Sequence, residues 1–234
     1  MTAAVVIATY NERENLALLA SAILEHPGYR IIVVDDDSPD GTGALADELA
    51  AGAPGRIAVI HRRGARGLGR SLVAGLKQAL ADGDADLIFQ MDADFSHDPK
   101  YLPDIAAAAA ADADLVLGSR YLHGVSVVNW PLHRIILSAF ANRYIRAVTG
   151  LEAHDCTTGY RCWRRDALAR LPLDTLISDG YAFLVEQLYL AKRFGCRVRE
   201  VPIIFVERRR GVSKVSSGVL LESVIVPWRL LLKR

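Results

Sequence analysis

The stretch Asp86-Leu87-Ile88-Phe89-Gln90-Met91-Asp92-Ala93-Asp94 joins an apolar run to two carboxylates that stand one residue apart. The apolar run is typical of a buried strand, and open α/β sheets bind ligands at the carboxyl ends of their strands. Residues i and i+2 of an extended chain point to the same side. Asp92 and Asp94 can therefore both offer oxygen atoms to one hard divalent cation.

Two neighbouring residues leave this interpretation open. His97 follows three positions after Asp94 and could add a nitrogen ligand or a contact through water. Alternatively, Asp94 only caps the helix that begins near Pro99, which is a common use of aspartate.

The composition excludes some classes of protein. The chain has 234 residues, enough to bury about 70% of its unfolded surface, and its formal net charge of +1 provides no general basic field for nucleic acid. Its three cysteines, Cys156, Cys162 and Cys196, lack the spacing of zinc ligands and are typical of a reducing compartment. No signal peptide is visible at the start, so we expect a cytosolic protein.

Strand and helix patterns alternate along the first half of the chain. Strands are expected at 3–8, 30–35, 56–61, 86–89 and 114–118, and helices after Asn11, at 44–51, at 71–81 and after Pro99. Asn11 and Glu14 have the spacing of a capping box for the first helix. This alternation predicts a single α/β domain with a mostly parallel, doubly wound sheet flanked by helices. The character of the sequence changes after residue 120.

Three loops at predicted strand ends suit a nucleotide. The loop 9–12 lacks the glycines of a dinucleotide fingerprint and the Gly-rich opening of a nucleotidyltransferase. Asp35 and Asp36 can accept hydrogen bonds from a base or ribose, or they form a solvated turn. The loop 62–70 has four arginines and three glycines, so it either approaches phosphate or is a solvated loop.

Five motifs resemble those of family 2 glycosyltransferases. They are Ala-Thr-Tyr-Asn-Glu-Arg-Glu-Asn-Leu at 8–16, Val-Val-Asp-Asp-Asp-Ser-Pro-Asp-Gly-Thr at 33–42, Gly-Leu-Gly at 67–69, Met-Asp-Ala-Asp-Phe-Ser-His at 91–97 and Gly-Ser-Arg-Tyr at 118–121. The similarity continues through 130–134, 155–161 and 205–214, and is greatest to the dolichol-phosphate and polyprenol-phosphate mannosyltransferases. The resemblance implies a GT-A type fold in one domain, 1–234, with a nucleotide-sugar half (1–120), an acceptor half (121–215) and a possible interfacial C-terminal helix (216–234).

The resemblance also implies roles for individual residues. Asp92 and Asp94 would hold Mg2+ or Mn2+ on the donor pyrophosphate, and Ser96 stands where some members have a third ligand. The implied nucleotide-sugar contacts are Thr9, Tyr10, Asn11, Glu12, Asp35, Asp36, Gly67, Asp92, Arg208 and Lys214. The implied acceptor contacts are Arg120, Arg134, Asp155 and Arg161. With Asp92 and Asp94, the catalytic residues would be Arg120, Arg134, Arg208 and Lys214, four cations that are otherwise ordinary surface charges.

The implied reaction is inverting transfer of mannose from GDP-mannose to dolichyl or polyprenyl phosphate. A lipid monophosphate arrives ionised, since its second pKa is near 6, so no strong protein base is required. Asp155 and Glu186 remain candidates for one, although Glu186 also fits a solvated helix position. The alternatives are a UDP-sugar (glucose or aminosugar) polyprenyl-phosphate transferase, a noncatalytic sugar-nucleotide-binding protein and a nucleotidyltransferase.

A lipid acceptor requires access to a membrane. Residues 130–148 read as an amphipathic helix with too many charges to span a bilayer. Residues 219–234 are apolar but short, and with Trp228 they suit an interfacial helix or a helix that packs on its own domain. We expect a peripheral protein on the cytosolic face of the membrane, with a possible separate membrane-anchoring subunit and no nucleic-acid partner.

Overall fold

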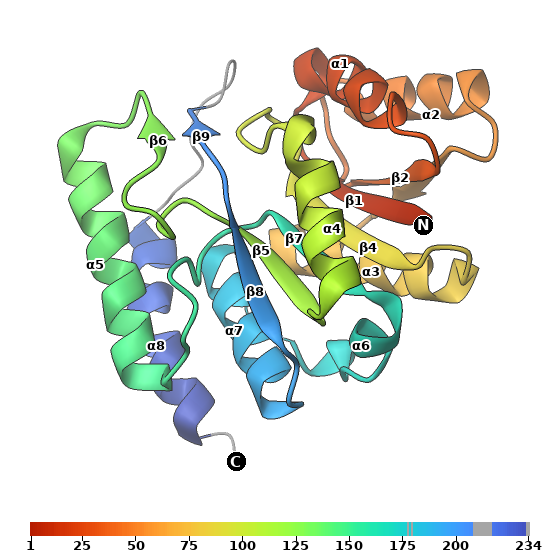
Figure 1. Ribbon diagram of the computed structural model, residues 1–234. Helices are drawn as coiled ribbons and strands as arrows, with labels where there is room; N and C mark the ends of the chain where they lie inside the picture. The colour runs from red at the N-terminus through yellow and green to blue at the C-terminus, as the bar shows by residue number, and fades with distance from the viewer. Residues whose placement is uncertain (177, 179, 208–216, 233–234) are drawn as a thin grey trace.

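A mixed sheet forms the centre of the molecule (Figure 1). The structure is a computed structural model, and it describes residues 1–176, 178, 180–207 and 217–232. The strand order is β3-β2-β1-β4-β7-β5-β8, and β7 alone runs antiparallel to its neighbours in this sheet. These strands are β1 (Ala3–Thr9), β2 (Tyr29–Asp35), β3 (Ile57–His61), β4 (Leu87–Asp92), β5 (Leu115–Ser119), β7 (Arg161–Arg164) and β8 (Val198–Pro202). A separate parallel ribbon pairs β6 (Val127–Val128) with β9 (Phe205–Val206).

Helices cover both faces of the sheet (Figure 1). One face carries α1 (Arg13–Leu24), α2 (Thr42–Gly52) and α4 (Leu102–Ala111), and the other carries α3 (Leu68–Asp82) and α7 (Gly180–Arg193). Beside α7 lies α8 (Ser217–Leu232), and α5 (Leu132–Thr149) packs on α8. The short elements are α6 (Arg165–Ala169), η1 (Pro99–Tyr101) and η2 (Leu173–Thr175). Across the described helices, none combines the length and the apolar content needed to cross a bilayer.

The apolar side chains of each central strand alternate between the two faces of the sheet. In β1, Ala4 and Val6 pack in the cluster that contains α3 and α7, while Val5 and Ile7 pack in the cluster that contains α1 and α4. Successive side chains of a strand point to opposite faces, so a strand covered on both sides must be apolar throughout. This is why the strand runs read as continuous apolar stretches rather than as alternating ones.

The predicted alternation and the mostly parallel sheet are confirmed, with differences at element ends. The fourth strand continues to Asp92, and α3 begins at Leu68, three residues earlier than expected. The antiparallel β7 was not predicted, because its four residues, Arg161–Arg164, carry no local signal of direction. It lies between β4 and β5, so a strand from the later part of the chain is inserted between two strands of the first 120 residues.

Two predicted caps are wrong. Asn11 has a positive φ of 57°, and its backbone N–H donates to Ser38 Oγ at 3.0 Å, so it does not cap α1. Glu12 precedes the helix and accepts a hydrogen bond from Asn15 Nδ2 at 2.9 Å. The helix-cap alternative for Asp94 also fails, because Asp98 accepts from the Lys100 N–H at the start of η1.

Close packing of α3 on the sheet depends on Gly75. A Cβ atom at this position would lie 2.4 Å from Val6 Cγ1 and 2.9 Å from Val34 Cγ2.

We therefore expect Gly75→Ala to lower the free energy of unfolding by about 1–3 kcal/mol through overpacking, measured by denaturant and thermal unfolding. Gly52→Ala is the matched control, since nothing lies within 4 Å of its Cβ position. Equal stability of the Gly75 variant and the wild type would contradict this account.

Candidate active site

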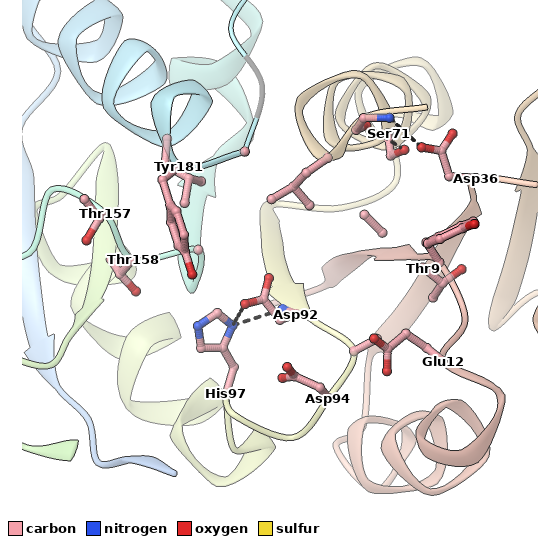
Figure 2. Close-up of a pocket in the computed structure, with 18 of the residues that line it drawn as sticks. Thr9, Glu12, Asp36, Ser71, Asp92, Asp94, His97, Thr157, Thr158 and Tyr181 are labelled. Atoms are coloured by element: carbon pink, nitrogen blue, oxygen red, sulfur yellow. Dashed lines mark hydrogen bonds and ion pairs between the residues drawn. The ribbon is translucent and has the colours of Figure 1, made fainter. Parts of the chain in front are cut away.

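A cavity of about 500 Å3 opens at the carboxyl ends of β1, β2 and β4. Figure 2 shows that Asp92 and Asp94 lie on its floor between the Thr9–Asp36 side and the Thr157–Tyr181 side. The predicted residues in its lining are Thr9, Tyr10, Glu12, Asp36, Gly67, Asp92, Asp94 and Arg120. Arg208 and Lys214 lie outside the described residues.

Asp92 is exposed at the cavity, whereas Asp94 is 7% exposed and is oriented by its own loop. The Asp92 side chain is 44% exposed. Asp94 is held from behind, because the backbone N–H and hydroxyl of Ser96 donate to its Oδ1 at 3.1 and 2.6 Å. Ser96 is buried and does not line the cavity, so the expectation of a Ser96 ligand is replaced by a role in orienting Asp94.

His97 also acts within the loop. Its Nδ1 accepts the Asp92 backbone N–H at 2.9 Å, and its ring stacks on Tyr160 with centroids 5.0 Å apart. Burial lowers the pKa of His97, against the opposing effect of Asp92 and Asp94. The bond to Asp92 occupies the Nδ1 lone pair, so this nitrogen is not available as a metal ligand.

The carboxylates of Asp92 and Asp94 could hold a hard divalent cation whose remaining ligands come from a substrate. Within the part of the chain that the structure describes, no cluster of three or more His, Cys, Asp or Glu side chains is arranged to hold a metal. Mg2+ is commonly bound by one or two carboxylates together with substrate phosphates. Asp92 and Asp94, two carboxylates in the lining of one cavity, match that pattern.

Asp35 and Asp36 have different positions. Asp35 is buried, accepts hydrogen bonds from the Thr9 and Ser38 hydroxyl groups at 3.2 and 2.6 Å, and is absent from the lining. Asp35 therefore joins the loops after β1 and β2 and does not face the cavity. Asn11 does the same, because its backbone N–H donates to Ser38 Oγ and it is absent from the lining. Asp36 faces the cavity, as predicted from its place at a strand end.

The arginine-rich loop partly neutralises Asp36. Arg62 forms an ion pair with Asp36, and the Gly67 N–H donates to the other carboxylate oxygen at 2.7 Å. The Gly67 amide therefore binds a protein carboxylate. Arg66 lines the cavity and lies over the Tyr10 ring, with Cζ 4.6 Å from the centroid.

Arg120 and Asp155 form a buried ion pair. The Nε and Nη2 atoms of Arg120 each lie 2.7 Å from a carboxylate oxygen of Asp155, which is 0% exposed. Burial alone would raise the pKa of Asp155, but Arg120 outweighs it, so the pKa lies below its ordinary value. Asp155 is therefore neither an available base nor an acceptor contact; it fixes Arg120, which lines the cavity.

Two other predicted cations lie behind the lining. Arg134 forms an ion pair with Glu207, and its Cζ is 4.0 Å from the centroid of Trp130, which does line the cavity. Arg161 is 0% exposed and donates to the carbonyl oxygens of Cys156 and Thr158 and to Gln187. Burial lowers the pKa of Arg161 to about 10. Its contacts hold the loop 156–158 and do not face an acceptor.

Glu186 does not face the main cavity. It is 4% exposed, so the expectation of a solvated helix position is wrong. Its Oε2 accepts the Ser178 N–H at 2.9 Å, and it borders a second cavity of about 320 Å3. This placement removes Glu186 as a candidate base.

The structure adds lining residues that the sequence analysis did not assign to the site. They are Ala8, Leu68, Ser71, Ala93, Trp130, Thr157, Thr158, Gly159, Gly180, Tyr181, Leu184 and Phe205. His97 and Arg66, which the sequence had singled out beside the acidic pair and in the arginine-rich loop, also line the cavity. Gly159 is placed most tightly, since a Cβ there would lie 3.3 Å from Asp92 Oδ1 and 3.2 Å from His97 Cε1. Its motif, 155–161, was recognisable in the sequence, but its approach to Asp92 was not.

Two curated proteins are similar to this chain over nearly its whole length. The chain is 47% identical over 227 residues to the polyprenol monophosphomannose synthase of Mycolicibacterium smegmatis, covering 96% of this chain and 85% of that protein. It is 43% identical over 221 residues to the undecaprenyl-phosphate mannosyltransferase of Micrococcus luteus, covering 94% and 90%.

Solved structures share the fold. Glucosyl-3-phosphoglycerate synthase from Mycobacterium tuberculosis, crystallised with Mn2+, UDP and glucosyl-3-phosphoglycerate, superposes with a TM-score of 0.67 at 19% identity, covering 97% of this chain and 78% of that one. A crystal of the same enzyme with Mg2+ and UDP gives a TM-score of 0.64 at 19% identity, covering 97% and 78%. The expected GT-A type fold is confirmed. The model of the family described as Glycosyl transferase family 2 matches residues 4–171, more than half of the chain, and the chain therefore belongs to glycosyltransferase family 2.

Proposed function

We propose that this protein transfers mannose from GDP-mannose to a polyprenyl or dolichyl phosphate with inversion at the sugar carbon. The observation that carries the proposal is one cavity lined by Asp92 and Asp94 together with the paired cation Arg120. The two relatives named for polyprenol monophosphomannose synthesis and undecaprenyl-phosphate mannosyl transfer support mannose as the sugar and a lipid phosphate as the acceptor.

The reaction requires an attacking nucleophile and a leaving group that is stabilised as it departs. An acceptor phosphate oxygen attacks C1 of mannose while the bond from C1 to the nucleoside diphosphate breaks. Asp92 and Asp94 would hold Mg2+ or Mn2+, which when bound stabilises charge on the departing diphosphate as a Lewis acid. Bound Mn2+ and Mg2+ in the structural neighbours support this choice of metals.

The acceptor side requires alignment more than proton transfer. A phosphomonoester is already largely ionised at neutral pH, so the attack releases no proton to the protein. Arg120, fixed by Asp155, would offer positive charge to the acceptor phosphate, and the Trp130 and Phe205 rings would border its path. Thr9, Tyr10, Glu12 and Asp36 would contact the nucleoside from the other side of the cavity.

An apolar face beside the cavity supports peripheral docking on a membrane. Its exposed residues are Leu132, Ile136, Leu137 and Phe140 on α5 and Val224, Ile225, Trp228, Leu231 and Leu232 on α8. The two helices lie side by side (Figure 1). Trp228 Nε1 donates to Tyr144 Oη at 2.7 Å, and Tyr144 donates to the Val224 carbonyl at 2.8 Å. Exposed Arg143 and Arg146 on α5 add positive charge, which suits an anionic cytosolic leaflet, alone or beside a membrane-anchoring subunit.

Transfer of labelled sugar tests the function directly. GDP-mannose, UDP-glucose and UDP-N-acetylglucosamine would be supplied separately to the protein with vesicles that contain polyprenyl phosphate, with Mg2+ or Mn2+ or with chelator. Metal-dependent label in lipid from GDP-mannose alone is expected. Label from a UDP-sugar would replace the donor, and no lipid label from any donor would contradict the proposal.

Asp92→Asn and Asp94→Asn should each reduce kcat/KM at least about 100-fold, because an amide is a poor ligand for a hard cation. The melting temperature without metal should stay within a few degrees of the wild type, since neither side chain supports the core. Asp166→Asn is the matched control, as Asp166 is 69% exposed and pairs with Arg164 on the surface. Full activity in a folded Asp92 or Asp94 variant would rule out the metal assignment.

Gly159→Ala should reduce kcat/KM roughly tenfold, because its Cβ would displace the Asp92 carboxylate by a few tenths of an ångström. The apparent Mn2+ affinity during turnover should weaken in parallel. Gly52→Ala again serves as the control for a glycine-to-alanine change without contacts. Unaltered metal dependence in the Gly159 variant would refute the role of this close approach.

Phe140→Glu should weaken co-sedimentation with anionic vesicles about tenfold or more, since burial of a phenylalanine side chain contributes roughly 1.5–3 kcal/mol. Leu18→Glu is the matched control, because Leu18 is 65% exposed on α1, away from the apolar face. Equal loss in both variants, or no loss in either, would argue against docking through α5 and α8.

A further inference from the structure

Ser178 connects three helices immediately before α7. It is 4% exposed. Its backbone N–H donates to Glu186 Oε2 on α7 at 2.9 Å, and its Oγ accepts from Arg229 Nη2 on α8 at 2.6 Å. Its carbonyl oxygen lies against α3, because a Cβ atom on Gly69 would be only 2.7 Å away.

Two of these helices line the cavity with the residues at which they begin. Gly180 and Tyr181 at the start of α7, and Leu68 at the start of α3, belong to the lining. Figure 2 shows the Tyr181 side chain extending toward Asp92 and His97, beside Thr157 and Thr158. Ser178 therefore stands two residues before Gly180, next to the side of the cavity that Gly180 and Tyr181 form, called here the Tyr181 wall.

Arg229 reaches this wall from a different part of the chain. It lies on α8, and no residue of α8 is part of the cavity lining among those described. The adjacent Trp228 is 55% exposed on the apolar face, whereas Arg229 points inward to Ser178. A hydrogen bond from a guanidinium group is stronger than one between neutral partners, so Arg229 is well suited to hold Ser178 in place.

We propose that Arg229 is a positioning residue, through which the C-terminal helix α8 holds Ser178 and thereby the Tyr181 wall of the active site. The proposal rests on the proposed function, since it assigns Arg229 a role in that reaction without contact to substrate. It predicts that removal of either partner alters the same wall and that removal of both has no additional effect.

Hydrogen exchange tests the contact without any assumption about the substrate. In purified protein, Arg229→Gln and Ser178→Ala should each accelerate exchange of the amides of residues 181–185 roughly tenfold. Ser178→Ala keeps the backbone N–H that donates to Glu186, so it tests the hydroxyl alone even if the Arg229 variant folds poorly. Arg164→Gln, at a surface ion pair with Asp166, is the matched control. Exchange at wild-type rates in both test variants would overturn the proposal.

Kinetics then separate positioning from general stability. We expect kcat/KM for sugar transfer to fall roughly tenfold in each single variant, to fall no further in the double variant, and to recover with Arg229→Lys, which keeps a cationic donor. Additive losses in the double variant would overturn the proposal. A wild-type protein that transfers no sugar would refute the proposed function, while the exchange result would still decide the role of Arg229.

Discussion

The parallel register of β1 with its two neighbours determines where the chemistry is placed. Thr9 of β1 stands opposite Asp35 of β2, and Ala8 stands opposite Asp92 of β4. The three strands therefore end at one edge, where the following loops carry Asp36 and Asp94. A shift of one residue in any pairing would turn every side chain of the shifted strand to the other face, and the close packing of buried side chains on both faces of β1 opposes such a shift.

The second half of the chain completes the cavity through internal polar contacts. Arg120 and Asp155 come from segments 35 residues apart, and Asp155 is itself held by Glu200, which accepts its N–H at 3.0 Å. Removing one member of a buried ion pair leaves an uncompensated charge. Arg161 serves the same loop by binding its carbonyl oxygens. These buried charges give this side of the cavity a fixed shape, and Arg120 alone among them lines the cavity.

The helices α5 and α8 connect the cavity to the apolar face. Trp130 lines the cavity just before α5 begins, and the exposed apolar residues of α5 start at Leu132. On α8, adjacent residues turn outward and inward, Trp228 to the apolar face and Arg229 to Ser178. Under the proposed function, α5 and α8 would together form the face that meets the membrane. The same two helices would also help to position the cavity that receives the lipid phosphate.

From the amino-acid sequence alone we could predict the alternation of strands and helices, the mostly parallel sheet and the pair Asp92 and Asp94 at a strand end. This was possible because period, strand length and the residue types at strand ends are local properties. Asp36, Glu12 and Arg120, which the motifs had also singled out, line the cavity. Which of the polar residues face the cavity, in contrast, depends on how the elements pack against one another.

Asp35, Ser96, Asp155 and Arg161 have the same chemistry as lining residues, yet they bind other protein groups. The antiparallel β7, the approach of Gly159 to Asp92 and the bond from Arg229 to Ser178 all join segments distant in sequence. Such pairings depend on packing between elements, and no local pattern of residues specifies which buried donor meets which acceptor.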